Sequence, residues 1–476
     1  MNIFTQVSIF LIFPLTIFSS PYTVTNYLDD ITRQHHQKDI LNQQRAIATE
    51  AYTQSMAVTD WKINTSLTNS RVEPTASSSF VANYIQSNTV QFGIDRSLLA
   101  TGGRFGFNFS HQRVQQPEVN FNGIQFNQPL FHTASFGIQF TQPLLFGFGG
   151  EIPKQAIRIA SANAHQANLQ TKDQFETFIY QELVNFVDWT LANEVTELSF
   201  SRFQLAREAY KQTKDRVQVN LSEKIDLLRA EYALENAQQF WQSQNARLKA
   251  IQSKNASRLN QQSIRQVTPQ FNLYETAYLK RPDYIVVKNL RIISSTSKQK
   301  DVLKHQLSLN QSQRNGNLTF TGSYDFLNGS NQFIDSQKLH NNNVAFSLNY
   351  QRSLSDTFTQ SKVSEATLLL QQFELQESQR IRDVTAEIIS LYTLIEEYKT
   401  QLDSTLNQII ISQRKAAAEN DLYKQGRSSL DMLIQAQDNV LSSKLNYARL
   451  SADYQKSVLL YQSITDVLIK EYGVEI

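Results

Sequence analysis

The chain has 476 residues with 14 glycines, 9 prolines, no cysteine and a formal net charge of +2 at pH 7. The absence of cysteine excludes disulfide bonds, thiolate metal sites, a cysteine nucleophile and a lipidated N-terminal cysteine. Acidic and basic residues are interspersed, which argues against nucleic-acid binding, and so few glycines and prolines predict long uninterrupted elements.

The first predicted segment is a signal peptide over residues 1–20. Residues 7–18 form an apolar run, which has the length of a signal-peptide core and is too short for a spanning helix. No Lys or Arg precedes this run, and Pro21 disfavours cleavage directly after Ser20. A buried N-terminal strand or helix is therefore the alternative. A polar, helix-compatible segment follows, and we expect an N-terminal helix over residues 21–60.

Strands are predicted in residues 61–147, where the apolar residues change to a period of two. Four runs alternate in this way: "WKINTSL", "VQFGIDRSL", "RFGFNFSH" and "ASFGIQFTQPLL". The sequence "ATGG" at 100–103 predicts a hairpin turn between the second and third runs. A Gln- and Asn-rich insertion lies between Ser70 and Thr133, and the hairpin inside it either joins the other strands or extends away from them.

Long helices are predicted after these strands, because residues 154–219 contain neither Gly nor Pro. At 1.5 Å per residue such a helix is roughly 100 Å long. We expect a first long helical hairpin over 148–262, then a loop and a helix over 263–313. Two further strands over 314–353 and a second long helical hairpin over 354–476 complete the chain, and the helices of this hairpin are expected over about 357–424 and 429–470.

The order of helix, strands and two long helices thus occurs twice, which indicates an internal duplication. Placing Asn220 on Gly426, an offset of 206 residues, aligns "NLSEKIDLLRAE" with "GRSSLDMLIQAQ". Asn enters the left-handed region more readily than most residues, so Asn220 can end a helix as Gly426 does. Both halves are therefore predicted to fold a long helix back on itself at this point.

The strands predict a membrane environment, because their apolar face has no partner in a soluble globule that also holds such long helices. In an outer membrane, lipid covers the apolar positions and the polar positions face an aqueous lumen. The polar positions are Asn64, Gln139, Thr141, Ser347 and Asn349. One chain has too few strands to close a wide barrel, so several copies have to share it. The predicted fold class is an α+β membrane protein, a shared transmembrane β-barrel continued by a long α-helical coiled-coil tunnel.

Three short segments resemble the TolC family of outer-membrane efflux proteins. These are "TQPLLFGFGG" at 141–150, "LKRPD" at 279–283, and "YKQGRSSLDMLIQAQ" at 423–437, and their order and spacing follow that family's layout. The resemblance implies a homotrimer with one β-barrel and one helical tunnel. It also implies docking to a periplasmic adaptor (membrane fusion) protein and an inner-membrane pump of RND, ABC or MFS type.

The resemblance further implies that the two turns between long helices lie at the periplasmic tip, where the tunnel narrows and the adaptor docks. Of the residues that form the constriction in the best-known member, Tyr423 and Asp226 match by position. Arg427 and Asp431 are each displaced by one residue, which places a similar gate and its aspartate ring in question. The candidate docking residues are Val219, Asn220, Leu221, Ser222, Gln425, Gly426, Arg427 and Ser428.

Asp226 has two interpretations. In a threefold assembly three copies of this carboxylate would come close and raise one another's pKa values. A charge at a helix start, stabilised by the helix dipole, is the alternative. Ser428, Met432 and Gln435 occupy the remaining places of the family's constriction pattern.

The predicted function is that of an outer-membrane channel, a passive exit duct for a tripartite efflux pump or a type I secretion system. The alternative is a periplasmic or surface coiled-coil scaffold without a pore. An enzyme is the weakest interpretation, because no nucleophile, base or metal motif occurs. His35 and His36 lie together on a polar helix without a carboxylate at ligand spacing. No cofactor, no metal and no nucleic-acid partner are expected.

Overall fold

The computed structural model describes residues 22–75, 82–121, 124–126, 130–259 and 267–474. The predicted signal peptide therefore lies outside the described residues. The chain divides into two compact units. One, here called the helical unit, comprises residues 1–42, 171–291 and 381–476, and the other, the sheet unit, comprises residues 43–170 and 292–380.

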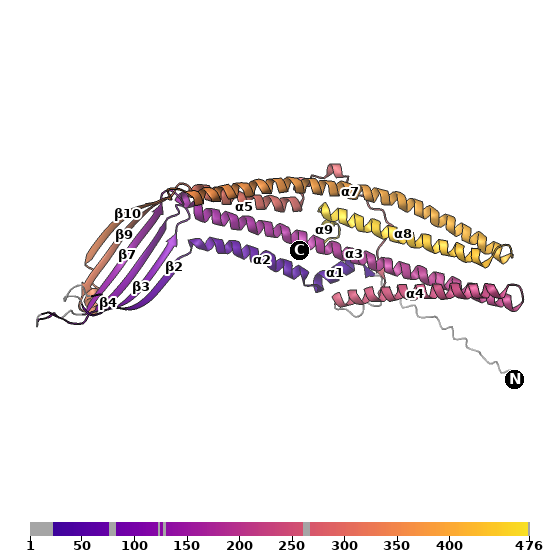
Figure 1. The fold of residues 1–476 in the computed structure, drawn as a ribbon, viewed down its shortest axis with the longest axis horizontal. Helices are drawn as coiled ribbons and strands as arrows, with labels where there is room; N and C mark the ends of the chain where they lie inside the picture. Colours follow the sequence, from indigo (N-terminus) through magenta and orange to yellow (C-terminus); the bar gives the residue numbers. More distant parts are fainter. Residues whose placement is uncertain (1–21, 76–81, 122–123, 127–129, 260–266, 475–476) are drawn as a thin grey trace, which may run out of the picture. The chain divides into compact units, whose positions relative to one another are not determined.

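The sheet unit contains a six-stranded antiparallel sheet with the order β10-β9-β7-β4-β3-β2 (Figure 1). Its strands are β2 (Lys62–Val72), β3 (Ile85–Ser97), β4 (Arg104–Gln115), β7 (Phe131–Pro143), β9 (Asn317–Ser330) and β10 (Asn341–Gln351). All six were predicted from the period of two. The hairpin inside the Gln- and Asn-rich insertion joins the others, because β3 and β4 lie between β2 and β7.

The register places most large apolar residues of the six strands on one face of the sheet, because residues directly opposite each other in an antiparallel pair share a face. Exceptions on the other face are Val72, Ile85, Val114, Phe131 and Leu327. Ile63 pairs with Ile94, which pairs with Phe107, and the row continues through Ile138 to Tyr324. The face carries Ile63, Leu67, Val90, Phe92, Ile94, Phe105, Phe107, Phe109, Phe136, Ile138, Phe140, Phe320, Tyr324, Phe326, Val344, Phe346, Leu348 and Tyr350. The residues predicted to be polar-facing lie on the opposite face.

Short elements complete the sheet unit. The predicted turn at "ATGG" closes the hairpin of β3 and β4, with Gly102 in a left-handed conformation at a φ of 74°. A small hairpin of β5 (Val119–Phe121) and β6 (Ile124–Phe126) lies in the connection from β4 to β7, and α6 (Phe333–Ser336) lies between β9 and β10. Helix α5 (Arg291–Gln313) is tied to α7 by Lys300, whose ammonium lies 3.1 Å from the carboxylates of both Glu374 and Glu377.

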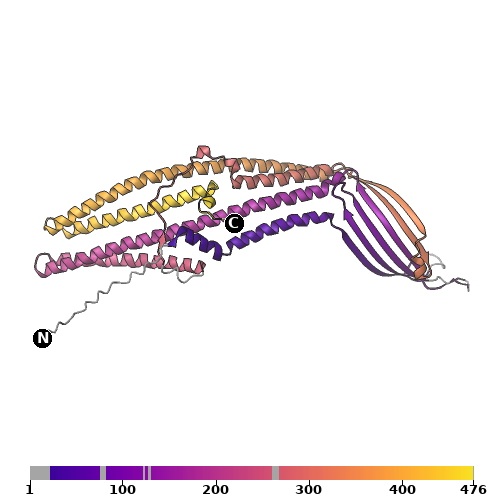
Figure 2. The same cartoon turned by 180° about the vertical axis from the view of Figure 1, so that it is seen from behind.

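Two pairs of long helices dominate the chain. α3 (Glu151–Gln218) and α7 (Thr357–Lys424) have 68 residues each, and α4 (Lys224–Arg258) and α8 (Leu430–Ile464) have 35 each. Within the helical unit α4 runs beside α3 and α8 runs beside α7, as both views show (Figure 2). None of the helices in the described parts of the chain is both long and apolar enough to cross a membrane.

Two expected helices are broken. The N-terminal segment forms α1 (Val24–Gln34) and α2 (Gln37–Met56), separated at His35, whose backbone is extended. The last helix was expected to run from 429 to 470, and this was wrong: α8 ends at Ile464 and a short α9 (Leu468–Glu471) follows. The break occurs at Asp466, which has a left-handed φ of 60° and whose carboxylate accepts the backbone N–H of Arg291 at 2.7 Å.

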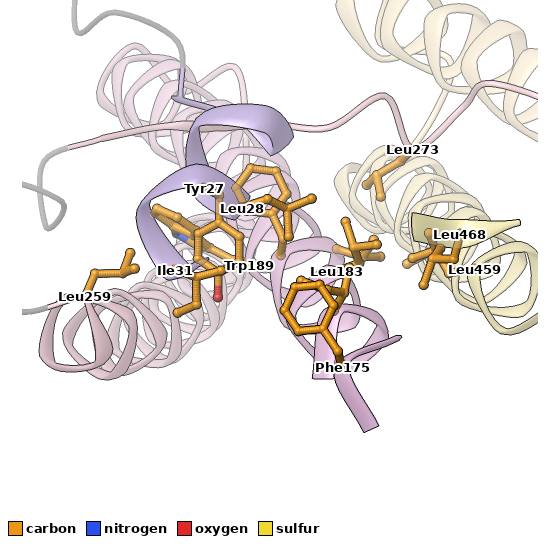
Figure 3. Packing of buried hydrophobic residues seen from close by; sticks show 14 of the residues in the cluster. Tyr27, Leu28, Ile31, Phe175, Leu183, Trp189, Leu259, Leu273, Leu459 and Leu468 are labelled. Carbon is orange, nitrogen blue, oxygen red and sulfur yellow. The ribbon is translucent and has the colours of Figure 1, made fainter. Parts of the chain in front are cut away.

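The core of the helical unit gathers α1, α3, α8 and α9 around large apolar side chains (Figure 3). Tyr27 and Ile31 of α1 lie in this cluster with the buried Phe186 and Trp189 of α3, and Leu459 of α8 belongs to it as well. The parallel pair β1 (Tyr22–Thr23) and β8 (Pro269–Gln270) fastens the chain before α1 to the segment after α4. This core holds the lengths of α3, α4 and α8 that lead to the two turns.

Candidate functional site

The first turn of the candidate site joins α3 to α4. Asn220 adopts a left-handed conformation with a φ of 61°. Its backbone N–H donates to the carbonyl of Val217 at 3.1 Å, and the N–H of Leu221 donates to the carbonyl of Arg216 at 2.8 Å. These two bonds make a Schellman motif, which satisfies the last carbonyls of a helix. The sequence prediction that Asn220 ends α3 is therefore confirmed.

The second turn, between α7 and α8, has the same backbone. Gly426 has a φ of 70°, its N–H donates to the carbonyl of Tyr423 at 3.0 Å, and the N–H of Arg427 donates to that of Leu422 at 2.9 Å. A Cβ built on Gly426 would meet no atom within 4 Å. The glycine is thus favoured by its backbone conformation and not by crowding.

The side chains of the two turns differ in chemistry. In the first turn the apolar Val219 and Leu221 are exposed, and Leu221 reaches 69% exposure. In the second turn Gln425 and Arg427 are exposed instead. The hydroxyl of Ser428 donates to the carboxylate of Glu419 at 2.6 Å, which fastens the second turn to the end of α7.

Tyr423 is buried inside the packing of this chain's own helices. It lies in a small cluster with Ala230 of α4 and Leu433 of α8. Its hydroxyl lies 3.4 Å from that of Thr213, and the guanidinium of Arg216 lies 4.9 Å from the centre of its ring. Within one chain Tyr423 therefore joins α3, α4, α7 and α8, and its role in a constriction stays a prediction.

Asp226 lies in the first turn of α4 and is partly exposed. It accepts a hydrogen bond from the hydroxyl of Ser222 at 2.9 Å, and its carboxylate lies 3.4 Å from the guanidinium of Arg229. The helix dipole stabilises an anion at this position. The structure gives Asp226 and Tyr423 separate partners, so it does not bring the two predicted constriction residues into contact.

Two ion pairs that sequence reasoning missed join the two helical hairpins close to the turns. Arg229 of α4 reaches Asp431 of α8 at 3.4 Å. Arg202 of α3 donates to Asp438 of α8 at 2.7 Å and to Gln437 at 3.2 Å. Asp431 and Asp438 are seven residues apart, so they lie on one face of α8, and this spacing was the only indication in the sequence.

The two ion pairs differ in burial. The side chain of Arg202 is only 6% exposed, whereas that of Arg229 is 43% exposed. Both carboxylates are 57% exposed. The Arg202 pair is therefore the stronger link between the hairpins, because water competes less for a buried guanidinium.

The candidate site holds no group of three or more His, Asp or Glu side chains that could ligate a metal, and none occurs elsewhere in the described residues. The arrangement consists of two capped turns, one buried tyrosine and two interhelical ion pairs. It is suited to contact with another protein and to holding two helical hairpins together.

Comparison with known proteins supports the fold. No family model matches the sequence, and no curated protein matches it either. Among solved structures, the outer membrane protein VceC from Vibrio cholerae matches with a TM-score of 0.68 at 9% identity, covering 94% of this chain and 96% of that one. The Campylobacter jejuni CmeC outer membrane channel matches with a TM-score of 0.68 at 13% identity, covering 94% and 89%.

The open state of the Neisseria gonorrhoeae MtrE outer membrane channel matches equally well, with a TM-score of 0.68 at 12% identity and coverage of 94% and 89%. Identities this low establish the fold alone. The chain thus has the fold of TolC-family outer-membrane channels, as the three sequence segments predicted. Two of these matched structures, CmeC and MtrE, are described as outer membrane channels.

Proposed function

We propose that the chain is the outer-membrane exit duct of a tripartite efflux pump or a type I secretion system. In this proposal a homotrimer in the outer membrane lets small molecules or proteins pass from an inner-membrane pump to the exterior. Its helices extend into the periplasm. The channel is passive, since the pump supplies both the energy and the choice of substrate.

The observation that carries the proposal is the apolar face of the six-stranded sheet. Its side chains are strongly exposed on the edge strands, with Leu67 of β2 at 83% and Phe346 of β10 at 74%, and those of β4, β7 and β9 are half-buried. Burying such a face in hydrocarbon stabilises it, while the polar face suits an aqueous lumen. The strands have 11 to 14 residues, which is enough to cross a bilayer, since about 9 to 11 are needed.

The two edges of the sheet support a trimer. β2 and β10 each have only one neighbour in the sheet, and an unpaired edge favours pairing with another chain. Three copies of six strands make eighteen, a number at which closed barrels leave a water-filled channel. Pairing of β2 with β10 of the next copy would close the ring.

The helix bounds support two internal repeats. α3 and α7 differ by 206 residues at both ends, and so do α4 and α8. Equal lengths and equal Schellman turns in both hairpins are expected when one unit has been duplicated. We propose that both turns lie at the periplasmic end, where Asp226 and Tyr423 contribute to the constriction and residues 219–222 and 425–428 contact a periplasmic adaptor.

The experiment that tests the proposal is single-particle imaging of the detergent-extracted protein, followed by conductance in planar bilayers. We expect a particle with threefold symmetry and discrete conductance steps. A scaffold without a pore predicts extraction without detergent and no conductance, and that pair of results would overturn the channel proposal.

Two neighbouring substitutions in β4 give a matched control. Phe109 lies on the apolar face, with Phe92 and Phe136 opposite it, and Ser110 lies on the polar face. Arginine on a lipid-facing strand costs roughly 2–4 kcal/mol at mid-depth and much less in a lumen. We expect Phe109→Arg to be depleted from outer-membrane fractions and Ser110→Arg to accumulate there normally.

A further inference from the structure

A cleft of about 490 Å³ lies between α3, α4 and α8 in the helical unit, away from the two turns. All three helices contribute charged side chains: Asp188 from α3, Arg247 and Lys254 from α4, and Arg449, Asp453 and Lys456 from α8. Its volume falls in the range of pockets that bind small molecules, roughly 300–1,000 Å³.

The two acidic side chains of the cleft share one lysine. The ammonium of Lys456 lies 2.5 Å from the carboxylate of Asp188 and 3.9 Å from that of Asp453. These are the two carboxylates that line the cleft. Four cations and two carboxylates line the cleft, so its formal charge is +4 − 2 = +2.

Three further cations line the same cleft. Arg247 and Lys254 lie seven residues apart on α4, with Ile251 between them, and Arg449 faces them from α8. Among the described residues the structure gives these three side chains no carboxylate partner. Positive charges that converge on one cleft raise the local concentration of anions, and arginine is well suited to carboxylate and phosphate groups.

A buried donor points to a ligand independently of the charges. Asn255 is only 3% exposed, it lines the cleft, and its side-chain nitrogen has no hydrogen-bond partner among the described residues. A buried polar group without a partner is unfavourable, so such groups are normally satisfied. An acceptor atom in the cleft would satisfy this one.

The apolar part of the lining comes from Leu191, Ala192, Val195 and Ile251. We propose that this cleft binds a small organic anion, with a phosphate or carboxylate held by Arg247, Lys254 and Arg449 and an apolar part packed against the apolar lining. The side-chain amide of Asn255 donates to an oxygen of the same molecule. This site is separate from the turns and does not depend on the channel function.

Titration of the full-length, detergent-solubilised protein with phenyl phosphate tests the proposal by calorimetry. Inorganic phosphate and benzyl alcohol serve as comparison probes, because each carries only one of the two recognised features. We expect phenyl phosphate to bind more tightly than either probe and to bind more weakly as salt is raised. Binding should also raise the melting temperature, since it joins three helices.

Substitutions separate the site from general electrostatics. Arg247→Gln with Arg449→Gln should weaken binding of phenyl phosphate at least tenfold, and Asn255→Leu should weaken it severalfold. Lys249→Gln is the matched control: Lys249 is also an exposed cation on α4 but does not line the cleft, so affinity should not change.

The proposal would be overturned by any of three results. Phenyl phosphate does not bind, as it would not if a second copy of the chain covered the cleft. Inorganic phosphate binds equally well. Lys249→Gln weakens binding as much as the double substitution, which would mean that the overall charge attracts the anion and the cleft does not recognise it.

Discussion

Replacing Asp438 with asparagine tests whether burial sets the strength of the ion pairs that join the two helical hairpins. The chain offers an internal control, because Asp431 lies one heptad earlier on α8 and also pairs with an arginine of the first hairpin. The two aspartates are equally exposed, so the pairs differ in the burial of the arginine and in the N···O distance. Arg202 is buried and lies 2.7 Å from Asp438, whereas Arg229 is more exposed and lies 3.4 Å from Asp431.

The expected magnitudes follow from these environments. Leaving a fully buried charge unpaired costs about 3–5 kcal/mol. Asp438 is 57% exposed, so water at this position can partly hydrate the Arg202 guanidinium once the carboxylate has been replaced. The loss should therefore approach that of a hydrogen bond to a charged group, about 1.5–3 kcal/mol. Asp431→Asn removes a solvated pair and should cost less than about 1 kcal/mol.

Denaturant unfolding of the protein in detergent measures both losses, and double-mutant cycles with Arg202→Met and Arg229→Met isolate the pair terms. Raising the salt concentration should weaken the Arg229 pair and leave the Arg202 pair nearly unchanged. The argument from burial would be refuted if the two pairs had equal coupling energies, or if high salt abolished the coupling energy between Arg202 and Asp438.

Three further predictions concern backbone and charge. Burial raises the pKa of Asp173 to about 6, against the opposing effect of Arg291 and with help from Asp466. Since its folded pKa is raised, Asp173 favours the folded state below about pH 4 and costs stability as the pH rises from about 4 to 6. Asp173→Asn should flatten this dependence in unfolding measurements and stabilise the protein at pH 7 by about 2 kcal/mol; an unchanged pH profile would contradict it. Gly426→Ala should cost about 1 kcal/mol from its left-handed backbone alone, whereas Asn220→Gly should be neutral or slightly stabilising, so a melting experiment that finds both destabilising would oppose this account. Asp466→Ala should cost about 2–3 kcal/mol because it loses two hydrogen bonds to Arg291 and keeps a left-handed φ, and Asp466→Asn should lose less; equal losses would mean that the backbone does not matter there.

The sequence predicts the long elements well because their period and punctuation are local properties. α7 was expected over about 357–424 and runs from Thr357 to Lys424. The break before α9 was missed because Asp466 is held in its left-handed conformation by Arg291, a residue 175 positions earlier. A contact between residues so far apart in the sequence cannot be predicted from a local pattern.

The contacts of the candidate site were harder to predict for the same reason. Asn220 and Gly426 were predictable as helix ends from residue type alone. The burial of Tyr423 depends on Ala230 and Leu433, which come from two other helices. The pairing of Arg202 with Asp438 spans 236 residues of sequence, so it follows from the packing of α3 on α8 and not from any local motif.

The two turns show which property of the site the fold requires and which it leaves free. Both use the same Schellman backbone, because a long helix can reverse only if its last carbonyls are satisfied. Their exposed side chains differ, with Leu221 at the position of Arg427 when the hairpins are aligned at 206 residues. In a trimer the tips would then alternate between apolar and cationic turns around the ring. A partner that contacts all six turns has to offer two kinds of surface, one for the apolar turns and one for the cationic turns. The different side chains therefore decide which surfaces the partner needs, while the shared backbone gives all six turns the same shape.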